Sequence, residues 1–241
     1  MTSIADNIAA ALRPIAPDKE LRAADVPLIN QLAAQWAARS APATVPAPDA
    51  GARAPIETIR LTARGAAELI GHEAIVLEWY RDSEGVGTWG IGVTDASGHR
   101  VGRYKDNPQP IARCIEVYLW LLDTHYIPDV RRAFGGCQLT EAQFAAAISF
   151  HYNTGAILRT DWVKLFKAGK MSQAQSFLEG HYLNGGDLAE RRKKEAALFF
   201  DGVWSGDGTT TVWPVRKPSY TPAWGKGERV DVMPYLREAL P

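Results

Sequence analysis

Residues 73–88 read EAIVLEWYRDSEGVGT and contain two carboxylic acids, Glu73 and Asp82, and a hydroxyl at Thr88. After Glu73 the chain is apolar, turn residues follow around Gly85 and Gly87, and residues 88–93 have the composition of a short strand. This order predicts a β-hairpin whose turn contains the two glycines. Asp82 and Thr88 would then flank that turn, polar and partly solvated.

Glu73 ends a segment with the period of an amphipathic helix. The apolar members of the helix face are Ala66, Leu69 and Ile70. Glu73 takes the next position on that face, where another apolar residue would be expected. A carboxyl group placed there loses hydration, which disfavours its charged form, and a general acid at neutral pH needs that property. A buried acid opposite a more solvated carboxylate, here Asp82, is the arrangement that cleaves glycosidic bonds.

The spacing of Glu73, Asp82 and Thr88, followed by the strand TWGIG of residues 88–92, resembles the catalytic motif of phage-type lysozymes. These are glycoside hydrolases of family 24, the endolysins of the T4 and P22 type. The resemblance covers about residues 56–201. It implies an α+β, mostly α-helical lysozyme fold, in which a small β-hairpin lobe and a helical lobe face each other across a cleft.

The same resemblance implies a reaction, hydrolysis of the β-1,4 bond between N-acetylmuramic acid and N-acetylglucosamine in peptidoglycan. Glu73 would protonate the leaving oxygen. Asp82 would stabilise the oxocarbenium-like charge and orient a water molecule that Thr88 holds. A carboxyl separation of about 6.5–9.5 Å would indicate an inverting enzyme and one near 5 Å a covalent intermediate, so the sequence leaves the stereochemical outcome open.

Four further positions are candidates for substrate binding. Glu84 and Gly92 belong to the motif itself. Tyr152 and Asn153 lie in the segment SFHYNTG, residues 149–155, which resembles a Phe-Asn-x-Gly segment that lines the cleft in the family. The alternative, with Tyr152 in the core and Asn153 as a helix C-cap, remains open at this stage.

The chain departs from the family pattern at one position and leaves a second segment ambiguous. Many family members have a histidine after the Gly-Ile-Gly strand, whereas this chain has Val93, and it is open whether His99 substitutes for it. The basic run at residues 191–194 resembles an Arg-Arg segment near the end of the lysozyme core. It could meet carboxylates of peptidoglycan, or it could be a solvated helix face with an Arg191–Glu195 pair.

Several classes of function have no support in the sequence. The chain has 27 basic and 27 acidic residues, so its net charge offers no general attraction to nucleic acid. The five histidines and two cysteines show no metal-ligand spacing, and we expect neither a metal nor another cofactor. Residues 85–90 spell G-x-G-x-x-G but lack the preceding buried strand and the following helix that dinucleotide binding requires.

The chain divides into four predicted segments. Residues 1–40 have two helical patterns, residues 41–55 form a linker rich in proline and alanine, residues 56–201 form the lysozyme-like domain, and residues 202–241 are a C-terminal extension. The extension is either a small wall-binding element or a tail strapped over the catalytic domain. Its tryptophans are Trp204, Trp213 and Trp224.

Local patterns also predict individual elements of the main domain. Residues 111–122 have the apolar spacing of a long helix that would link the lobes. Thr140 and Gln143 are spaced as a capping box at the start of another helix. Residues 101–104 are a possible third strand, and Cys114 is expected to be a small buried hydrophobe.

These patterns favour a monomeric phage endolysin that acts on bacterial peptidoglycan. No apolar run reaches about 18 residues and the N-terminus lacks the pattern of a signal peptide. We therefore expect the enzyme to collect in the host cytoplasm, without membrane insertion, and to need a holin to reach the wall. Three alternatives remain: an antibacterial effector with the same chemistry, a catalytically silent wall-binding or virion protein, and a chitinase-like enzyme.

Overall fold

The computed structural model describes residues 51–240, which fall within one compact unit of the chain. Predictions for residues 1–40, and for most of the linker at 41–55, lie outside the described residues. The last linker residues belong to the main unit, because β1 (Ala54–Pro55) pairs antiparallel with β5 (Gln138–Leu139). Ile56, where the main domain was predicted to begin, is fully buried.

Helix α3 (Ala63–Gly71) leads into the predicted hairpin. The Thr62 hydroxyl accepts a hydrogen bond from the Gly65 amide at 3.0 Å and so caps the helix. A sheet follows, made of β2 (Val76–Arg81), β3 (Gly87–Gly90) and β4 (Val93–Thr94) in that order, all antiparallel. The β2–β3 turn contains Gly85, as the sequence predicts, whereas Gly87 is the first residue of β3 and pairs with Arg81.

Two predicted strands differ from the structure. The strand predicted over residues 88–93 is interrupted after Gly90, because Gly90 and Gly92 have φ values of 65° and 69°, which turn the chain sharply. Residues 101–104, a possible third strand, form the 3₁₀ helix η5 (Val101–Tyr104). Its end residues Val101 and Tyr104 are buried, so the apolar spacing reflects a short helical turn rather than a strand.

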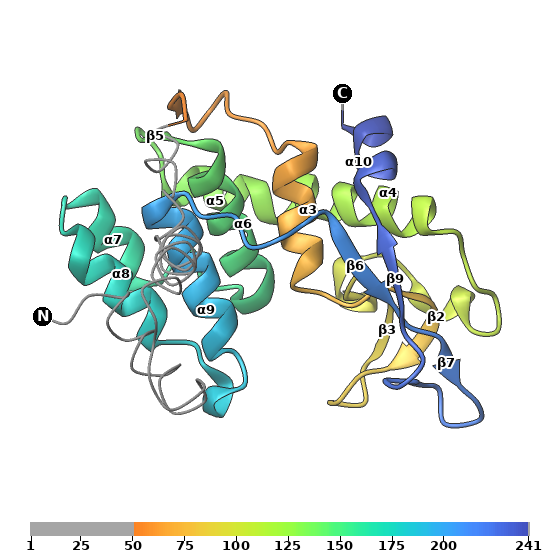
Figure 1. Cartoon of the computed structure of the whole chain (residues 1–241). Coiled ribbons are helices and arrows are strands. Elements are labelled where there is room, and N and C mark those ends of the chain that lie inside the picture. Colours follow the sequence, from red (N-terminus) through yellow and green to blue (C-terminus); the bar gives the residue numbers. More distant parts are fainter. Residues whose placement is uncertain (1–50, 241) are drawn as a thin grey trace, which may run out of the picture. The chain divides into compact units, whose positions relative to one another are not determined.

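The rest of the main domain is helical, as Figure 1 shows. The helices are α4 (Ile111–Leu121), α5 (Ile127–Ala133), α6 (Glu141–Thr154), α7 (Asp161–Lys167), α8 (Met171–Gly180) and α9 (Ala189–Ala196). A π-helical turn over Leu122–Tyr126 joins α4 to α5. The predicted capping box is present at the start of α6, where Thr140 and Gln143 bond each other's backbone amides.

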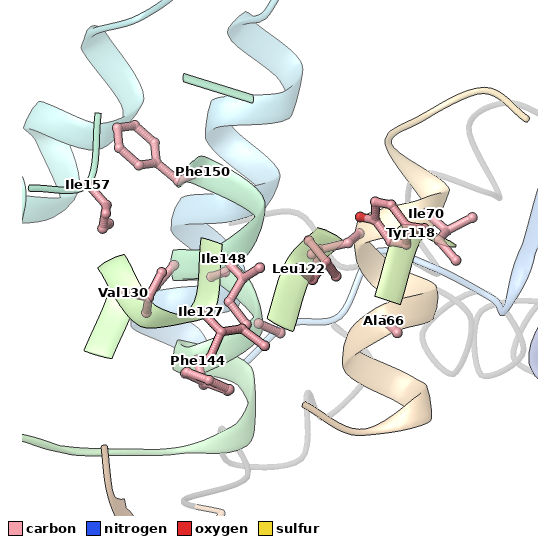
Figure 2. Close-up of a cluster of buried hydrophobic side chains, with 14 of the residues drawn as sticks. Ala66, Ile70, Tyr118, Leu122, Ile127, Val130, Phe144, Ile148, Phe150 and Ile157 are labelled. Carbon is pink, nitrogen blue, oxygen red and sulfur yellow. The ribbon is translucent and has the colours of Figure 1, made fainter. Parts of the chain in front are cut away.

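Helix α6 lies at the centre of the helical region. Ten consecutive residues, Ala142 to His151, are buried, so the helix is covered on all sides. Figure 2 shows Phe144, Ile148 and Phe150 of α6 among buried side chains that include Ile127 and Val130 of α5. Helix α3 packs against α6, and Cys114 of α4 is fully buried, as predicted.

The C-terminal extension folds back onto the β-sheet region. It contains β6 (Thr209–Val212), β7 (Val215–Arg216), β8 (Thr221–Pro222), β9 (Glu228–Asp231) and α10 (Met233–Ala239). Strand β6 pairs with β9, and β7 pairs with β8. Figure 1 shows β6 and β9 beside the sheet that contains β2, and α10 packs on α3 and α4. The extension is therefore part of the same compact unit.

Candidate active site

Glu73 lies outside the helix that was predicted to bury it. Helix α3 ends at Gly71, and Glu73 begins the short connection to β2. Its side chain is 20% exposed rather than packed in the apolar core. The helical spacing from Ala66 is thus wrong for this residue, because the chain leaves the helix two residues earlier. Glu73 is a half-buried carboxyl at the junction of helix and sheet.

A guanidinium group fixes the direction of the Glu73 carboxyl. Nη1 of Arg191, on α9, donates to Oε1 of Glu73 at 2.5 Å, and Nε of Arg191 donates to Oε1 of Glu195 at 3.0 Å. The Arg191 side chain is only 10% exposed. Burial lowers the pKa of Arg191, but the carboxylates of Glu73 and Glu195 outweigh it and raise that pKa above its ordinary value. Arg191 therefore stays charged beside Glu73.

A buried polar network between α6 and α9 holds Arg191 in place. Oε1 of Glu195 accepts a hydrogen bond from the Ser149 hydroxyl at 2.7 Å, and Oε2 of Glu195 lies 3.1 Å from Nη1 of Arg192. Arg192 is completely buried and donates to the Asn153 side-chain oxygen at 2.6 Å. Burial raises the pKa of Glu195, and the two arginines oppose that shift. The network holds α9 against α6 and so sets the position of Arg191.

Asp82 organises the hairpin turn. Its Oδ1 accepts hydrogen bonds from the amides of Glu84 at 3.0 Å and Val86 at 2.8 Å, and its Oδ2 lies 3.2 Å from the Thr88 hydroxyl. Thr88 is 3% exposed, although it was predicted to be partly solvated. Register explains the burial, because Thr88 on β3 pairs with the buried Tyr80 on β2. One carboxylate oxygen of Asp82 thus shapes the turn and the other contacts a hydroxyl.

Burial and nearby negative charge raise the pKa values of four tyrosines in this region. Burial raises the pKa of the Tyr80 phenol, and the charges of Asp82 and Glu73 raise it further. Both carboxyls therefore lie within electrostatic range of one buried side chain. Burial likewise raises the pKa values of Tyr118, Tyr126 and Tyr152, and the charge of Glu73 adds to each shift. These phenols therefore remain protonated at neutral pH.

The four substrate-binding candidates lie in different environments. The Tyr152 hydroxyl donates to the carbonyl of Ile91 at 2.5 Å, which links α6 to the turn between β3 and β4. Asn153 receives the hydrogen bond from Arg192, and it is not a helix C-cap, because Gly155 ends α6. Glu84 and Gly92 are exposed. Polar groups of Tyr152 and Asn153 are therefore engaged within the protein.

His99 contacts Tyr104 rather than the candidate acids. Its Nε2 lies 2.9 Å from the Tyr104 hydroxyl, and among the hydrogen bonds of the described residues none joins His99 to Asp82 or Thr88. Val93 is fully buried and pairs with Trp89 across β3 and β4. Val93 is therefore an apolar member of this sheet.

The basic residues 191–194 differ in burial. The predicted Arg191–Glu195 pair is present, but Arg191 and Arg192 point into the protein, and only Lys193 and Lys194 are exposed. The sequence predicted that the run containing Arg191 either meets carboxylates of peptidoglycan or forms the Glu195 pair, and it did not predict that Arg191 contacts Glu73. One signal could have identified it: two adjacent arginines in a segment matching the family, followed by a glutamate at a spacing that pairs with both.

Other observations bear on ligands and membranes. Within residues 51–240, no cluster of three or more histidine, cysteine, aspartate or glutamate side chains is placed to hold a metal ion. No helix in this part of the chain is long and apolar enough to cross a membrane.

A pocket of about 690 Å³ opens at the start of α3, and the residues that line it include Thr62, Leu119 and Trp120. Neither Glu73 nor Asp82 lines this pocket.

Comparison with known proteins identifies the family. The model of the phage lysozyme family matches residues 71–195, a little over half of the chain, and the chain therefore belongs to the phage lysozyme family. This stretch contains Glu73, Asp82, Thr88 and Arg191. It ends before the C-terminal extension begins. No curated protein matches the sequence.

Solved structures with a similar arrangement include three lysozyme-type proteins. An endolysin from Escherichia coli O157:H7 phage FAHEc1 is 21% identical, with a TM-score of 0.49, over 61% of this chain and 98% of that protein. A mutant of P22 lysozyme is 23% identical, with a TM-score of 0.49, over 59% and 99%. The muramidase domain of SpmX from Asticaccaulis excentricus is 22% identical, with a TM-score of 0.44, over 58% and 98%.

Proposed function

We propose that this chain is an N-acetylmuramidase that cleaves the β-1,4 bond between N-acetylmuramic acid and N-acetylglucosamine in peptidoglycan. One observation carries the proposal. Glu73 precedes β2 and is oriented by the guanidinium of Arg191, and Asp82 follows β2 and is bonded to the buried hydroxyl of Thr88. Two carboxyls held in different surroundings are what acid-assisted glycoside hydrolysis needs. Membership of the phage lysozyme family supports peptidoglycan as the substrate.

The proposed roles follow from the contacts of each group. Glu73 protonates the leaving oxygen, and Arg191 keeps its carboxyl from rotating away. Asp82 has one oxygen committed to the turn amides, which leaves Oδ2, beside the Thr88 hydroxyl, to stabilise positive charge on the sugar and orient water. Thr88 and Asp82 together can hold that water by hydrogen bonds from both sides. Glu84, Gly92, Tyr152 and Asn153 remain proposed contributors to substrate binding.

The test is release of reducing ends from purified peptidoglycan by the wild type, Glu73→Gln and Glu57→Gln. Glu57 is exposed and lies outside the site, so its variant controls for loss of a surface carboxylate. We expect cleavage by the wild type and Glu57→Gln and a loss of roughly 10²–10⁴-fold in Glu73→Gln. Equal activity of all three proteins would remove Glu73 from the mechanism.

Borohydride reduction of the products identifies the bond that is cleaved. Reduced N-acetylmuramic acid at the new ends supports the proposal, and reduced N-acetylglucosamine would overturn it. Chitin oligomers test the chitinase-like alternative in the same assay. Proton NMR of the first product anomer separates inversion from retention. Binding to peptidoglycan without any cleavage would instead support the catalytically silent wall-binding alternative.

A role in host lysis is proposed from the family alone. The enzyme would accumulate in the cytoplasm as a monomer and reach the wall through a membrane lesion made by a holin. Expression in a bacterial host with and without a holin tests this role. Lysis that requires both proteins supports it, and lysis by the enzyme alone would contradict it.

A further inference from the structure

The backbone of the segment that carries Glu73 has few hydrogen-bond partners within residues 71–195, the part of the chain that matches the family. Residues 72–75 connect the end of α3 to the start of β2 without belonging to either. The amides of His72 and Glu73 bond the last turn of α3, at Leu69 and Ile70. Ile75 is fully buried, so its N–H and C=O groups need partners from elsewhere, because buried backbone groups are rarely left unpaired.

Strand β6 of the C-terminal extension provides those partners. The Thr210 hydroxyl lies 3.2 Å from the carbonyl oxygen of Glu73 and 3.3 Å from that of Ile70, so its one hydrogen is shared between them. The Ile75 amide donates to the carbonyl of Thr211 at 3.1 Å, and the Trp213 amide donates to the carbonyl of Ile75 at 2.8 Å. Thr210 is 3% exposed, so water does not compete for these bonds.

A buried carboxylate anchors the extension just before β6. Glu68, on α3, is 3% exposed and accepts hydrogen bonds from the amide and hydroxyl of Ser205 and from the amide of Gly206. The Gly206 bond is 2.8 Å long. Charge-assisted bonds of this kind are among the stronger ones in proteins. The start of β6 is therefore held to the same helix whose end precedes Glu73.

The extension also contacts the other end of β2. The Arg81 amide, next to Asp82, donates to the carbonyl of Tyr220 at 2.7 Å. The Tyr220 hydroxyl donates to Asp106 at 2.8 Å, and its ring meets Trp79 of β2 edge to face at 5.6 Å. Residues 205–220 thus contact both ends of the strand that separates the two candidate acids.

We infer that Thr210 is a positioning residue for the catalytic acid, and that the extension clamps the backbone on which Glu73 is carried. The inference rests on the proposed muramidase function. Thr210 does not touch substrate in this proposal. It acts through the carbonyl of Glu73 and keeps the carboxyl within reach of the glycosidic oxygen, where a displacement of about 1 Å can cost as much as a hundredfold in rate.

The experiment compares Thr210→Val, Thr210→Ser and Thr209→Val with the wild type. Valine keeps the shape of threonine without the hydroxyl, and serine keeps the hydroxyl. Thr209 is the matched control, because its hydroxyl lies on the same strand but bonds Asp207 within the extension. Each protein is assayed for kcat and KM on soluble peptidoglycan fragments, well below its measured Tm. Hydrogen exchange of the Ile75 amide reports on the clamp directly.

We expect Thr210→Val to lose roughly ten- to a hundredfold in kcat with KM nearly unchanged and with faster exchange at Ile75. Thr210→Ser should recover most of the activity, and Thr209→Val should match the wild type. A lower Tm of Thr210→Val with an unchanged kcat would show a merely structural role and overturn the inference. A wild type that does not cleave peptidoglycan would instead refute the proposed function, and the inference with it.

Discussion

Arg191 donates a hydrogen bond to the carboxylate of Glu73 at 2.5 Å across 118 residues of sequence. The pair joins α9 of the helical region to the connection before β2. On the backbone side, Thr210 holds the carbonyl of the same Glu73 from the C-terminal extension. The candidate acid is therefore fixed through its side chain by one part of the chain and through its backbone by another.

The Arg191 pair makes a prediction about stability. Arg191→Ala leaves Glu195, 1% exposed, with one arginine fewer, and removes the partner of Glu73. Breaking a buried ion pair by removing one member costs about 3–5 kcal/mol. We expect urea unfolding to show a loss of this size. Lys193→Ala is the matched control on the same helix, because Lys193 pairs with Glu190 at the solvent-exposed surface and its loss should leave stability nearly unchanged. Similar effects of both variants would contradict the role given to Arg191.

The Asp82–Thr88 contact makes a prediction about activity. Asp82→Asn keeps an oxygen that can accept from the amides of Glu84 and Val86, so the turn and the Tm should be preserved. Its activity should fall roughly 10²–10⁴-fold, because the carboxylate charge is lost. Thr88→Val should lose roughly tenfold, the size of one hydrogen bond in the transition state, and Thr88→Ser should retain activity. A Thr88→Val protein as active as the wild type would remove the water-holding role.

The lowered pKa of His72 should make the free energy of unfolding depend on pH. Burial, and then the charge of Arg191, lower the pKa of His72 from 6.5 to about 4, while Glu68 at 3.7 Å opposes the shift. Between these values the unfolded chain binds a proton that the folded protein does not. The contribution of the neutral His72 side chain to stability is therefore fully present above about pH 6.5, and it is lost as the pH falls toward 4. The His72 contribution should fall by about 2 kcal/mol between about pH 7 and about pH 5.

Urea unfolding at both pH values checks this sign. His72→Gln should lose less stability on acidification than the wild type, because a neutral amide cannot take up the proton. His125→Gln, which changes an exposed histidine, should follow the wild type. If His72→Gln lost as much unfolding free energy on acidification as the wild type, another titrating group would be responsible for the loss.

Local signals predicted the parts of the site that depend on short-range spacing. Asp82 and Thr88 were correctly expected on either side of one turn, because a hairpin brings the residues that flank its turn together. The capping box of Thr140 and Gln143 was correct for the same reason, since both partners lie within one turn of helix. These features need no knowledge of the rest of the fold.

Long-range contacts decided what the sequence could not predict. The helical period continued through Glu73, but α3 ends at Gly71, and β6 takes up the carbonyls of Ile70 and Glu73 through Thr210 from a distant part of the sequence. Arg191 fitted a local pair with Glu195, and nothing in its neighbourhood indicated Glu73. Tertiary partners override local spacing at both places, and both places belong to the candidate site.

The contact between Gly92 and Tyr152 makes the last prediction. Gly92 has φ of 69°, and a Cβ atom there would lie 3.0 Å from the Tyr152 hydroxyl. Gly92→Ala should therefore cost about 1–2 kcal/mol for the left-handed backbone and a further increment for crowding. Tyr152→Phe alone should cost about 1 kcal/mol, because it removes the hydrogen bond to Ile91.

A double-mutant cycle separates backbone strain from crowding. In the Tyr152→Phe background, Gly92→Ala should cost less than in the wild type, because the crowded oxygen is gone while the strain remains. Gly98→Ala is the matched control, since Gly98 has φ of 82° and a methyl group there would meet no atom of the described residues within 4 Å. Its cost should be the same in both backgrounds. If the Gly92 and Gly98 cycles gave equal coupling, the hydroxyl of Tyr152 would not be packed on Gly92, and the link from α6 to the β3–β4 turn would be absent in solution.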